Sequence, residues 1–361
     1  MLQKHLENIT DLRQPWKIRH NLSEAVIMVI CAVVSECEAW YQIEHYCKSK
    51  KEWFKEKLKL KLHNGIPSHD TFERLFAMIE PKEFEASFGL WINETVRLMK
   101  GETVSIDGKS ICASADDENR AIHMVSAWAN KQRLVLGQIK TDNKSNEIKA
   151  VPQLLDMLNV EGCVVTADAM SCQKDITKKI AEKKADYVLG LKGNQSSLYD
   201  DVKLYFDHIE VKTKTVTKEK GHGRIETREY FLESDIDWLQ QKPEWTNFNA
   251  IGMVKSRVLE KEILREEIRY FITSLTDVRA FAKSTREHWG IENSLHWVLD
   301  VAFNEDRCRM RKDNSGENFA VIRHIALNLL KKDNSKMSIK AKRHRCAYDD
   351  DFLAHILFEL L

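Results

Sequence analysis

Apolar residues recur along this chain with two different periods, and the change between them divides the sequence into regions. Up to about residue 100 the spacing is helical, and the apolar run from Ala25 to Val34 is typical of a buried helix. From about residue 103 the period is that of strands, with apolar runs over residues 103–107, 121–129 and 133–141. The pattern therefore predicts a helical N-terminal region followed by three consecutive antiparallel strands.

The following segments alternate between the two periods. Residues 146–158 and 171–184 are predicted helices, and residues 163–168 and 186–192 are predicted strands. A meander of three strands followed by helix, strand, helix and strand is the order of a ribonuclease-H-like α/β fold. Residues from about 205 to 275 then alternate like strands and indicate a β-rich insertion, after which helical spacing returns over residues 277–300. We therefore expect three domains: a helical N-terminal domain (1–100), an α/β domain with its insertion (101–330), and a basic, amphipathic helical tail (331–361).

Three acidic side chains lie at positions suited to a metal site. Asp107 and Asp168 each end a predicted buried strand, and Glu292 lies on the predicted helix 277–300. Carboxylates at strand ends converge at the mouth of a sheet, where a facing helix can add a third. Such a set offers hard oxygen ligands to Mg²⁺ or Mn²⁺, the ions that serve phosphodiester chemistry. Two simpler interpretations stay open: Asp107 could bind a turn, and Asp168 could cap the helix that follows it.

The predicted helix around Glu292 carries further polar side chains on one face. His288, Glu292, His296 and Asp300 follow one another at spacings of four residues. A zinc site formed by the two histidines and Glu292 is the alternative metal interpretation. At 1.5 Å per residue the histidines would lie about 12 Å apart along the helix axis. One ion cannot bind both, so we reject the zinc site.

Composition excludes several classes of protein. The chain has 361 residues, a formal net charge of +1, 43% hydrophobic and 31% charged residues, as an ordinary soluble protein has. No apolar run approaches the length of a membrane span, and the N-terminus lacks a signal-peptide h-region, so we expect a cytoplasmic protein with no membrane partner. Eight scattered cysteines without a C-x-x-C pair indicate reduced thiols and argue against a zinc knuckle.

The sequence resembles a known family along nearly its whole length. DLRQPWKIRHNLSEAVIMVICAVVSECEAW and NGIPSHDTFERLFA are similar to the N-terminal region of DDE insertion-sequence transposases, in the group that contains the H-repeat-associated proteins found beside Rhs elements. The catalytic part is similar in SIDGKS, AIHMVSAWA, GQIKTDNKSNEI, TADAMSCQKDI, GLKGNQ, GHGRIETREY and REHWGIENSLHWVLDVAFNEDRCR. The resemblance implies a ribonuclease-H-like domain of the retroviral-integrase type with a β insertion before the glutamate. It also implies two divalent ions held by a catalytic triad of Asp107, Asp168 and Glu292.

The resemblance further implies a reaction and its partners. We expect a DNA transposase with two Mg²⁺ ions, for which Mn²⁺ substitutes, acting as an endonuclease at the ends of the element and then joining each 3′-OH to target DNA. DNA is then the main partner, the protein is associated with the bacterial nucleoid when it acts, and a dimer is expected on paired DNA ends. Two alternatives stay open: a transposon-derived DNA-binding protein that is no longer catalytic, and a nuclease of this fold that cuts without joining.

Ten residues are candidates for contact with DNA. Lys109, two positions after Asp107, would reach a phosphate or a carboxylate. The others follow the predicted strand 186–192, lie on a Gly-flanked turn of the insertion, or surround the glutamate: Lys192, Asn194, Gln195, His222, Arg224, Arg286, His288, Asn293 and His296. Broader relatives carry a tyrosine, an arginine and a lysine around the glutamate, at positions where this chain has Thr285, His288 and Leu299. Arg286, Asn293 and His296 are candidates to replace them.

The basic segments and the chain ends allow two interpretations each. Lysine and arginine gather over residues 48–61, 212–228, 307–312 and 331–345, which could follow a phosphate backbone or be solvated surfaces. The N-terminal helices could recognise DNA ends or pair protomers, or could brace the catalytic core. The C-terminal segment DFLAHILFELL could contribute to a dimer contact or fold back on its own chain.

Overall fold

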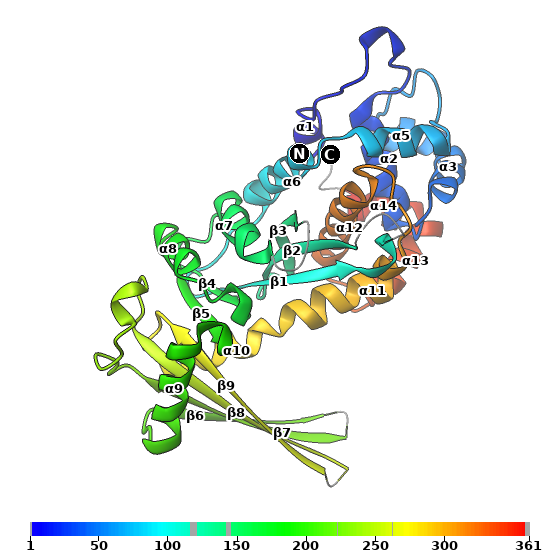
Figure 1. The fold of residues 1–361 in the computed structure, drawn as a ribbon. Helices are drawn as coiled ribbons and strands as arrows, with labels where there is room; N and C mark the ends of the chain where they lie inside the picture. The colour runs from blue at the N-terminus through cyan, green and yellow to red at the C-terminus, as the bar shows by residue number, and fades with distance from the viewer. Residues whose placement is uncertain (1, 116–120, 142–145, 222, 262, 358–361) are drawn as a thin grey trace.

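A single nine-stranded sheet forms the frame of the molecule. The computed structural model describes residues 2–115, 121–141, 146–221, 223–261 and 263–357. Its strands lie in the order β3-β2-β1-β4-β5-β9-β8-β7-β6. Figure 1 shows helices gathered around the first half of this sheet, whereas the last four strands reach away from most of them. The predicted α/β class, with a large mixed sheet, is confirmed.

The first five strands form the half of the sheet that the helices cover. The elements are β1 (Thr103–Ile111), β2 (Ile122–Ala129), β3 (Leu134–Thr141), α7 (Glu147–Met157), β4 (Val164–Ala167), α8 (Lys174–Glu182) and β5 (Asp186–Leu191). The first three strands form an antiparallel meander, as the sequence predicts, and β4 and β5 run parallel to β1. Their residues are mostly buried on both faces, as a sheet between helices requires.

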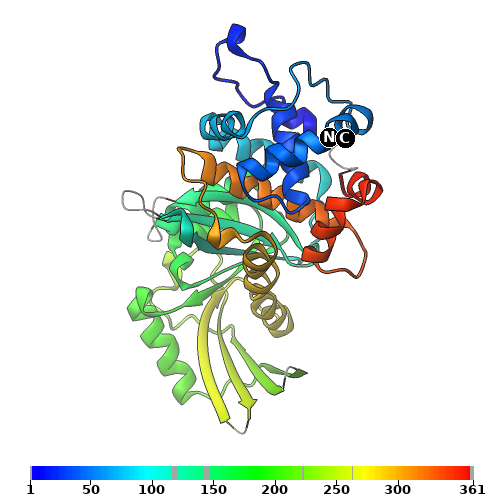
Figure 2. The ribbon, with the colours of Figure 1, turned by 90° about the vertical axis from the view of Figure 1, so that its right-hand side faces the viewer.

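The next strands continue the same sheet. The elements are α9 (Ser196–His208), β6 (Lys214–Gly221), β7 (Arg224–Glu233), β8 (Ala250–Glu260), β9 (Ile263–Thr273), α10 (Val278–His288) and α11 (Trp297–Phe303). β9 pairs with β5, so the predicted β-rich segment is joined edge to edge with the first five strands. Helix α9 packs on one face, where Tyr199 meets Tyr270, and α10 packs on the other, where Phe281 meets Phe271 (Figure 2).

The chain ends supply the remaining helices, and the predicted helical N-terminal region is present. The elements are α1 (Leu2–Leu6), α2 (Leu22–Val34), α3 (Trp40–Ser49), α4 (Lys51–Lys57), α5 (His69–Met78), α6 (Pro81–Thr95), α12 (Ser315–Lys332), α13 (Ile339–Tyr348) and α14 (Asp350–Leu357). The almost fully buried α2 packs on α12. The side chain of Asn328 in α12 exchanges two hydrogen bonds with the backbone of Val135 in β3. Asn328 thereby covers part of the outer edge of β3. One apolar core therefore includes both ends of the chain and the first half of the sheet.

The last described helix folds back on this core. Phe352, Leu353, Ile356 and Leu357 of α14 are buried within the chain, and Leu360 lies outside the described residues. Of the two interpretations of this amphipathic segment, packing on its own chain is therefore the one observed. No described helix is both long enough and apolar enough to cross a bilayer.

Candidate active site

Asp107 and Asp168 lie side by side on neighbouring strands. The parallel pairing of β1 with β4 ends at Ile106 and Ala167, and each aspartate is the next residue along the chain. Asp168 also caps the 3-10 turn η4 (Ala169–Ser171), because its carboxylate accepts hydrogen bonds of 3.0 and 3.3 Å from two backbone N–H groups of that turn. Beyond Asp107, β1 continues in its pairing with β2. The prediction that Asp107 ends its strand is wrong in that respect, although the adjacency of the aspartates holds.

Glu292 begins a wide helical turn. The sequence predicts one regular helix over residues 277–300, but a π-helical turn, η7 (Glu292–His296), separates α10 from α11. Such turns within α-helices are frequent at functional sites. Gly290 lies so close to Asn130 that a Cβ atom would collide with the Asn130 side-chain oxygen. Glycine at this position therefore lets the helix that carries Glu292 approach the sheet.

Asp168 and Glu292 both act electrostatically on Asp107. Burial raises the pKa of Asp107 to about 7, and the negative charges of Asp168 and Glu292 contribute to that rise. Partial burial also raises the pKa of Asp168, although part of its side chain still reaches solvent. Negative charge is therefore concentrated here without full compensation, and a cation bound at this point would lower the free energy of the ionised carboxylates.

Two neutral histidines face the sheet from the same helical segment. Nδ1 of His288 lies 3.0 Å from Oγ1 of Thr166, and Nδ1 of His296 lies 3.6 Å from a carboxylate oxygen of Asp107. Burial lowers the pKa of each histidine to about 4, so both are uncharged at neutral pH. The predicted common face is therefore present, and the histidines use it to contact β4 and β1. Their contact with DNA stays a prediction.

Lys109 lies on the same side of β1 as Asp107 and binds carboxylates. Its Nζ is 2.7 Å from Asp300, 2.7 Å from Asp306 and 3.4 Å from Glu305. The sequence allowed Lys109 a phosphate or a carboxylate as its partner, and the structure has carboxylates. These ion pairs fix β1 to α11 and to the turn that follows it.

Residues after β5 support the loop that follows Asp168. Asn194 and Gln195 donate hydrogen bonds of 2.7 and 3.0 Å to backbone carbonyls of that loop. Lys192 is exposed, and its positive charge opposes the burial that raises the pKa of Asp168. These three predicted DNA contacts are therefore gathered beside one triad residue, as expected for the mouth of the sheet.

A groove of about 570 Å³ opens between α10 and the facing side of β7, β8 and β9. Its lining includes five arginines and four glutamates, with an indole and an amide: Arg224, Arg228, Arg265, Arg269, Arg286, Glu226, Glu260, Glu266, Glu267, Trp289 and Asn293. Arg286 forms a two-pronged ion pair with Glu219, and the guanidinium of Arg269 lies 4.6 Å from the centre of the Trp289 ring. Three predicted residues, Arg224, Arg286 and Asn293, share this groove, whereas His222 lies outside the described residues.

Two known protein families match most of the sequence. The family described as "Transposase DDE domain" matches residues 98–329, which contain Asp107, Asp168 and Glu292. The chain belongs to the DDE transposase family. The family described as "DDE_Tnp_1-associated" matches residues 3–92, so the resemblance seen in the sequence is confirmed for both regions.

Relatives match this DDE transposase family member from end to end. It is 37% identical over 373 residues to "H repeat-associated putative transposase YhhI" of Escherichia coli (strain K12), covering 99% of this chain and 97% of that protein. It is 39% identical over 369 residues to "Putative transposase YncI" of Escherichia coli O157:H7, covering 99% and 94%. Among solved structures, "piggyBac transposase synaptic complex with hairpin DNA" aligns over 98% of this chain and 77% of that one, with a TM-score of 0.41 and 10% identity. So distant a structural likeness supports no conclusion about this chain.

Two further buried residues, which were not candidates in the sequence, lie against Gly108 of β1. His123 of β2 and Glu147 of α7 are both buried, and His123 Nε2 lies 2.5 Å from Glu147 Oε1. The negative charge of Glu147 contributes to the raised pKa values of Asp107 and Asp168. In the sequence, the only indication of a role was that both residues lie in segments similar to the family, AIHMVSAWA and GQIKTDNKSNEI. Neither residue ends a predicted strand or belongs to a set of polar residues at helical spacing.

The donor set of the triad suits a hard divalent cation. Carboxylate oxygens are the ligands that Mg²⁺ and Mn²⁺ prefer, and the raised pKa of Asp107 reflects burial and neighbouring charges that a cation would compensate. In the described part of the chain, no three His, Cys, Asp or Glu side chains lie close enough together to share one ion. The closing of Asp107, Asp168 and Glu292 around an ion therefore stays a prediction.

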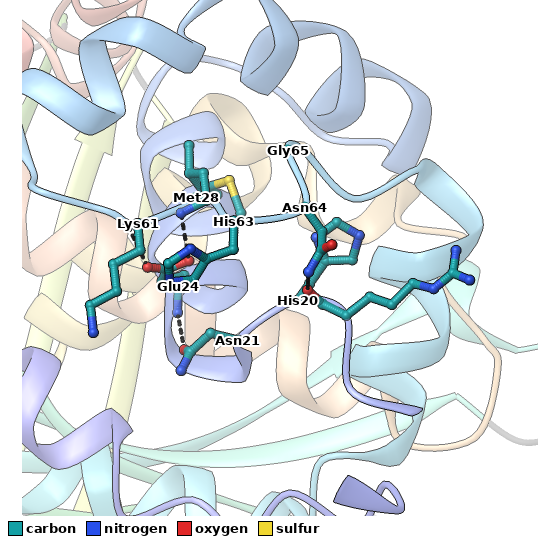
Figure 3. Close-up of a pocket in the computed structure, with 10 residues that line it drawn as sticks. His20, Asn21, Glu24, Met28, Lys61, His63, Asn64 and Gly65 are labelled. Carbon is teal, nitrogen blue, oxygen red and sulfur yellow. Dashed lines mark hydrogen bonds between the residues drawn. The ribbon is translucent and has the colours of Figure 1, made fainter. Parts of the chain in front are cut away.

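A second hollow, of about 180 Å³, belongs to the N-terminal helical region of this family member (Figure 3). Its lining residues all lie between Arg19 and Gly65. The carboxylate of Glu24 accepts a 2.7 Å hydrogen bond from the backbone N–H of Lys61, and Asn64 donates to the backbone carbonyl of Arg19. These polar groups join the start of α2 to the loop before α5, so we assign them a role in folding.

Proposed function

We propose that this chain is a DNA transposase that cleaves DNA at the ends of its element and joins the freed 3′-OH groups to target DNA. The observation that carries the proposal is the placement of Asp107 and Asp168 at adjacent positions of paired strands, with the charge of Glu292 acting on Asp107 from the facing helix. Membership of the DDE transposase family supports the reaction class.

We infer that β1 to β5 and their helices form a ribonuclease-H-like catalytic domain. The strand order β3-β2-β1-β4-β5, with β4 and β5 parallel to β1, supports this assignment. We keep the proposed division into residues 1–100, 101–330 and 331–361, with an insertion over about 205–275. The strands β6 to β9 lie within that proposed insertion.

Asp107, Asp168 and Glu292 are the residues proposed to hold two divalent ions, Mg²⁺ or Mn²⁺. When bound, such ions would activate the attacking oxygen and stabilise the leaving oxygen of an in-line displacement at phosphorus. The protein's own contribution is to hold the carboxylates in place. Lys109 fixes β1 to α11, and the side chains of Asn194 and Gln195 fix the loop after Asp168. Because these contacts hold the aspartates in place beforehand, less conformational entropy is lost when the site assembles.

The groove beside α10 is the proposed path of DNA. Arg224 and Arg265 can neutralise phosphates there, and Asn293 places one end of the groove next to Glu292. Arg269 and Arg286 would have to exchange their pairs with Glu267 and Glu219 for a phosphate, which is an exchange of one ion pair for another. Lys192, beside Asp168, would contact DNA at the other side of the site.

Assembly is proposed to involve two protomers, because two element ends must be held while both are joined to one target. Equivalent ends favour a two-fold arrangement. Since α14 already packs on its own chain, its apolar face is not the proposed contact, and DNA neutralisation by the basic segments is expected to drive pairing.

The proposal is tested by one assay that scores two products. Purified protein is incubated with duplexes carrying the ends of its own element, a supercoiled target, and Mg²⁺ or EDTA. Metal-dependent cleavage with strand joining is expected. Cleavage without joining would indicate the nuclease alternative, and binding without cleavage would indicate an inactive DNA-binding protein; either outcome would overturn the proposal.

A further inference from the structure

A cavity of about 450 Å³ lies where helix α3 meets the short turn η8 (Glu305–Arg307) and the segment that follows it. Trp40 and Tyr41 of α3 contribute to its lining, as do Arg307 and Arg309. The lining therefore combines the region matched by the DDE_Tnp_1-associated family with the region matched by the transposase DDE domain. This cavity shares no lining residue with the groove beside α10.

The basic segment 307–312 divides into side chains that stabilise the fold and side chains that do not. The guanidinium of Arg311 donates hydrogen bonds of 3.0 and 2.7 Å to a backbone carbonyl after β1, and Lys312 forms a 3.6 Å ion pair with a glutamate of α5. Arg307 and Arg309 are exposed, and neither side chain has a hydrogen-bond or ion-pair partner in the part of the chain that the structure describes. Two cations that the fold does not use therefore border the cavity.

Two buried side chains of the lining carry N–H groups without an acceptor. Arg323 of α12 is 1% exposed and Trp40 is 9% exposed. Among the described residues, neither Nη1 of Arg323 nor Nε1 of Trp40 has a hydrogen-bond partner. A carboxylate oxygen of Glu305 lies 3.7 Å from Nη1, too far for a hydrogen bond. Since buried N–H groups are normally hydrogen-bonded, a ligand that brings oxygen atoms to this wall would supply acceptors that the protein lacks.

Positive charge exceeds negative charge around the cavity. The described residues of the lining include three arginines and one carboxylate, that of Glu38. This carboxylate is already engaged, because it accepts hydrogen bonds of 2.7 Å from Asn304 and 3.2 Å from Arg343. His69, also in the lining, is paired with Glu44 at 2.7 Å. The unpaired charge is therefore positive, and the ligand that it would stabilise is an anion.

The cavity and the groove beside α10 lie at opposite ends of the helical segment that carries Glu292. Figure 1 shows α10 and α11 following one another along the sheet, and the cavity begins where α11 ends. Asn304 lies about 18 Å from Glu292 along the helix axis at 1.5 Å per residue, which about five phosphates of one DNA strand would span. Asp306 of η8 binds Lys109 of β1 at 2.7 Å, so the cavity is fixed to the strand of the first aspartate.

We propose that this cavity binds the phosphate backbone of DNA beside the cleaved bond, with Arg307 and Arg309 pairing with phosphates and Tyr41 donating a hydrogen bond to one of them. This inference rests on the proposed function, because it takes DNA as the ligand. Tyr41 is 58% exposed, and its hydroxyl has no partner among the described residues. Arginine and tyrosine side chains are among the groups that contact phosphates and sugars in protein–DNA complexes. A free nucleotide offers the same phosphate chemistry, so the test separates the two sources.

The first measurement is the salt dependence of DNA affinity. A fluorescein-labelled duplex carrying an element end is titrated with the full chain at several salt concentrations, and binding is followed by fluorescence anisotropy. Arg307→Gln and Arg309→Gln should each weaken binding roughly five- to tenfold. Together they should lower the slope of log affinity against log salt by at least about 1, because at least one phosphate contact is lost. Both side chains are exposed, so circular dichroism should show an unchanged fold.

Arg279→Gln is the matched control. Arg279 is an exposed arginine at the start of α10 and has no ion-pair partner among the described residues. It is a lining residue of neither the cavity nor the groove. The substitution removes the same charge, so affinity within about twofold of the unaltered protein is expected if only contacts at the cavity matter.

The second measurement reports contact at the cavity itself. Tyr41 is replaced by the photoreactive residue p-benzoylphenylalanine, and the complex with the labelled duplex is irradiated. A covalent protein–DNA product is expected. The same replacement at Tyr348, which is 69% exposed at the end of α13 and is not a lining residue, should give little or none. Long-range attraction by arginines cannot produce this difference, because the photoreaction requires contact.

The third measurement identifies the source of the phosphate. Deoxyadenosine monophosphate and inorganic phosphate are titrated into the full chain by calorimetry without DNA. We expect weak binding of both, since each offers a single phosphate. Tight binding of either one that Arg309→Gln removes, without crosslinking of Tyr41 to the duplex, would assign the cavity to a free anion and overturn the inference.

The outcomes also separate this inference from the proposed function. If the unaltered protein binds the duplex but Arg307→Gln and Arg309→Gln bind it equally well, and position 41 gives no crosslink, the cavity has no role in DNA binding and the proposed function stands. If the unaltered protein does not bind the duplex, both the proposed function and this inference fail.

Discussion

The two halves of the nine-stranded sheet are stabilised in different ways. In the first half, β2 is almost wholly buried from Ile122 to Ala129, whereas no residue of β6, from Lys214 to Gly221, is buried. The far ends of β7, β8 and β9 are held together by ion pairs, such as those of Arg257 with Glu229 and Glu266 at 3.2 and 2.7 Å. The first half thus rests on apolar burial between helices, and the far end of the second half on paired charges in water.

The difference shows what each half can do. Partial burial of Asp107 within β1, together with the negative charges of Asp168 and Glu292, raises the pKa of Asp107. In the second half, by contrast, the hydrogen bonds from Arg257 and Lys255 lower the pKa of Glu266. A surface of exchangeable ion pairs can trade a glutamate for a phosphate at small cost, which a buried core cannot do.

The largest effect should come from the buried half. Asp107→Asn removes a charge at nearly constant volume, so DNA cleavage should fall by at least about 10³-fold because the proposed cation would lose a ligand. The assay uses duplexes that carry the element ends. DNA affinity should change little, since the groove is untouched. Thermal stability at pH 7 should not fall, because the variant removes a carboxyl whose ionisation burial disfavours in the folded state. Retention of a tenth or more of the cleavage rate would contradict the assignment of Asp107.

A matched pair of apolar truncations tests the comparison directly. Ile106 in β1 is 1% exposed and Leu264 in β9 is 61% exposed. We expect Ile106→Ala to lower the free energy of unfolding by about 2–5 kcal/mol through lost burial and a residual cavity. Leu264→Ala should change it by about 0.5 kcal/mol or less. Both are measured by urea denaturation followed by circular dichroism, and similar losses in the two variants would show that the halves are not stabilised differently.

A buried glutamate beneath the first half should make stability depend on pH. Burial raises the pKa of Glu85 to about 9. Its folded-state pKa therefore exceeds the unfolded value, and this carboxyl favours the folded state fully below about pH 4.5. As the pH rises from 4.5 toward 9, the free energy of unfolding falls by about 1.4 kcal/mol per pH unit. By pH 7 the loss is about 3 kcal/mol.

Glu85→Gln should remove this dependence. At pH 7 the variant is expected to be more stable by up to about 3 kcal/mol, and near pH 4 the two proteins should be equally stable. Urea midpoints measured from pH 4 to pH 9 check the prediction. Parallel pH profiles for the two proteins would rule out a raised pKa at Glu85.

The smallest effect should come from single charges on the exposed half. Arg265 lines the groove, whereas Arg257 lies on the opposite face of the same strands, paired with Glu229. Arg265→Gln should weaken DNA binding roughly five- to tenfold and reduce the slope of log affinity against log salt by about 1. Fluorescence anisotropy at several salt concentrations measures both. Arg257→Gln serves as the control, and equal effects of the two variants would remove the groove as the path of DNA.

The sequence predicted those features that depend on local period and on chain order. The strands β1 to β5, and the adjacency of Asp107 and Asp168, follow from apolar runs and from the order of strands and helices. Family membership followed from strings such as HWGIENSLHW, and the comparisons confirm it. The roles of the triad and of the DNA-contact residues stay predictions.

Features that arise from long-range packing could not be predicted. Lys109 finds Asp300 nearly two hundred residues later in the chain, and no period marks that pair. The π-helical turn at Glu292 and the close approach of Gly290 to Asn130 are likewise not revealed by helical spacing. The joining of the insertion to β5 is equally a matter of tertiary contact, because alternation predicts a strand but not its neighbour.

The joining of β9 to β5 has a mechanical consequence. β9 spans eleven residues, about 36 Å at 3.3 Å per residue, and only its last part is paired with β5, from Tyr270 to Thr273. The other edge of β5 is paired with β4, the strand that leads to Asp168. A load applied at the free tip of the β8–β9 hairpin therefore acts as a torque on β5. That strand transmits the torque to β4 or breaks its four pairs with β9. Helix α10 packs on β6 and β7 and also on β1 and β4, so force on the hairpins reaches the strands of the aspartates through β5 and α10 together.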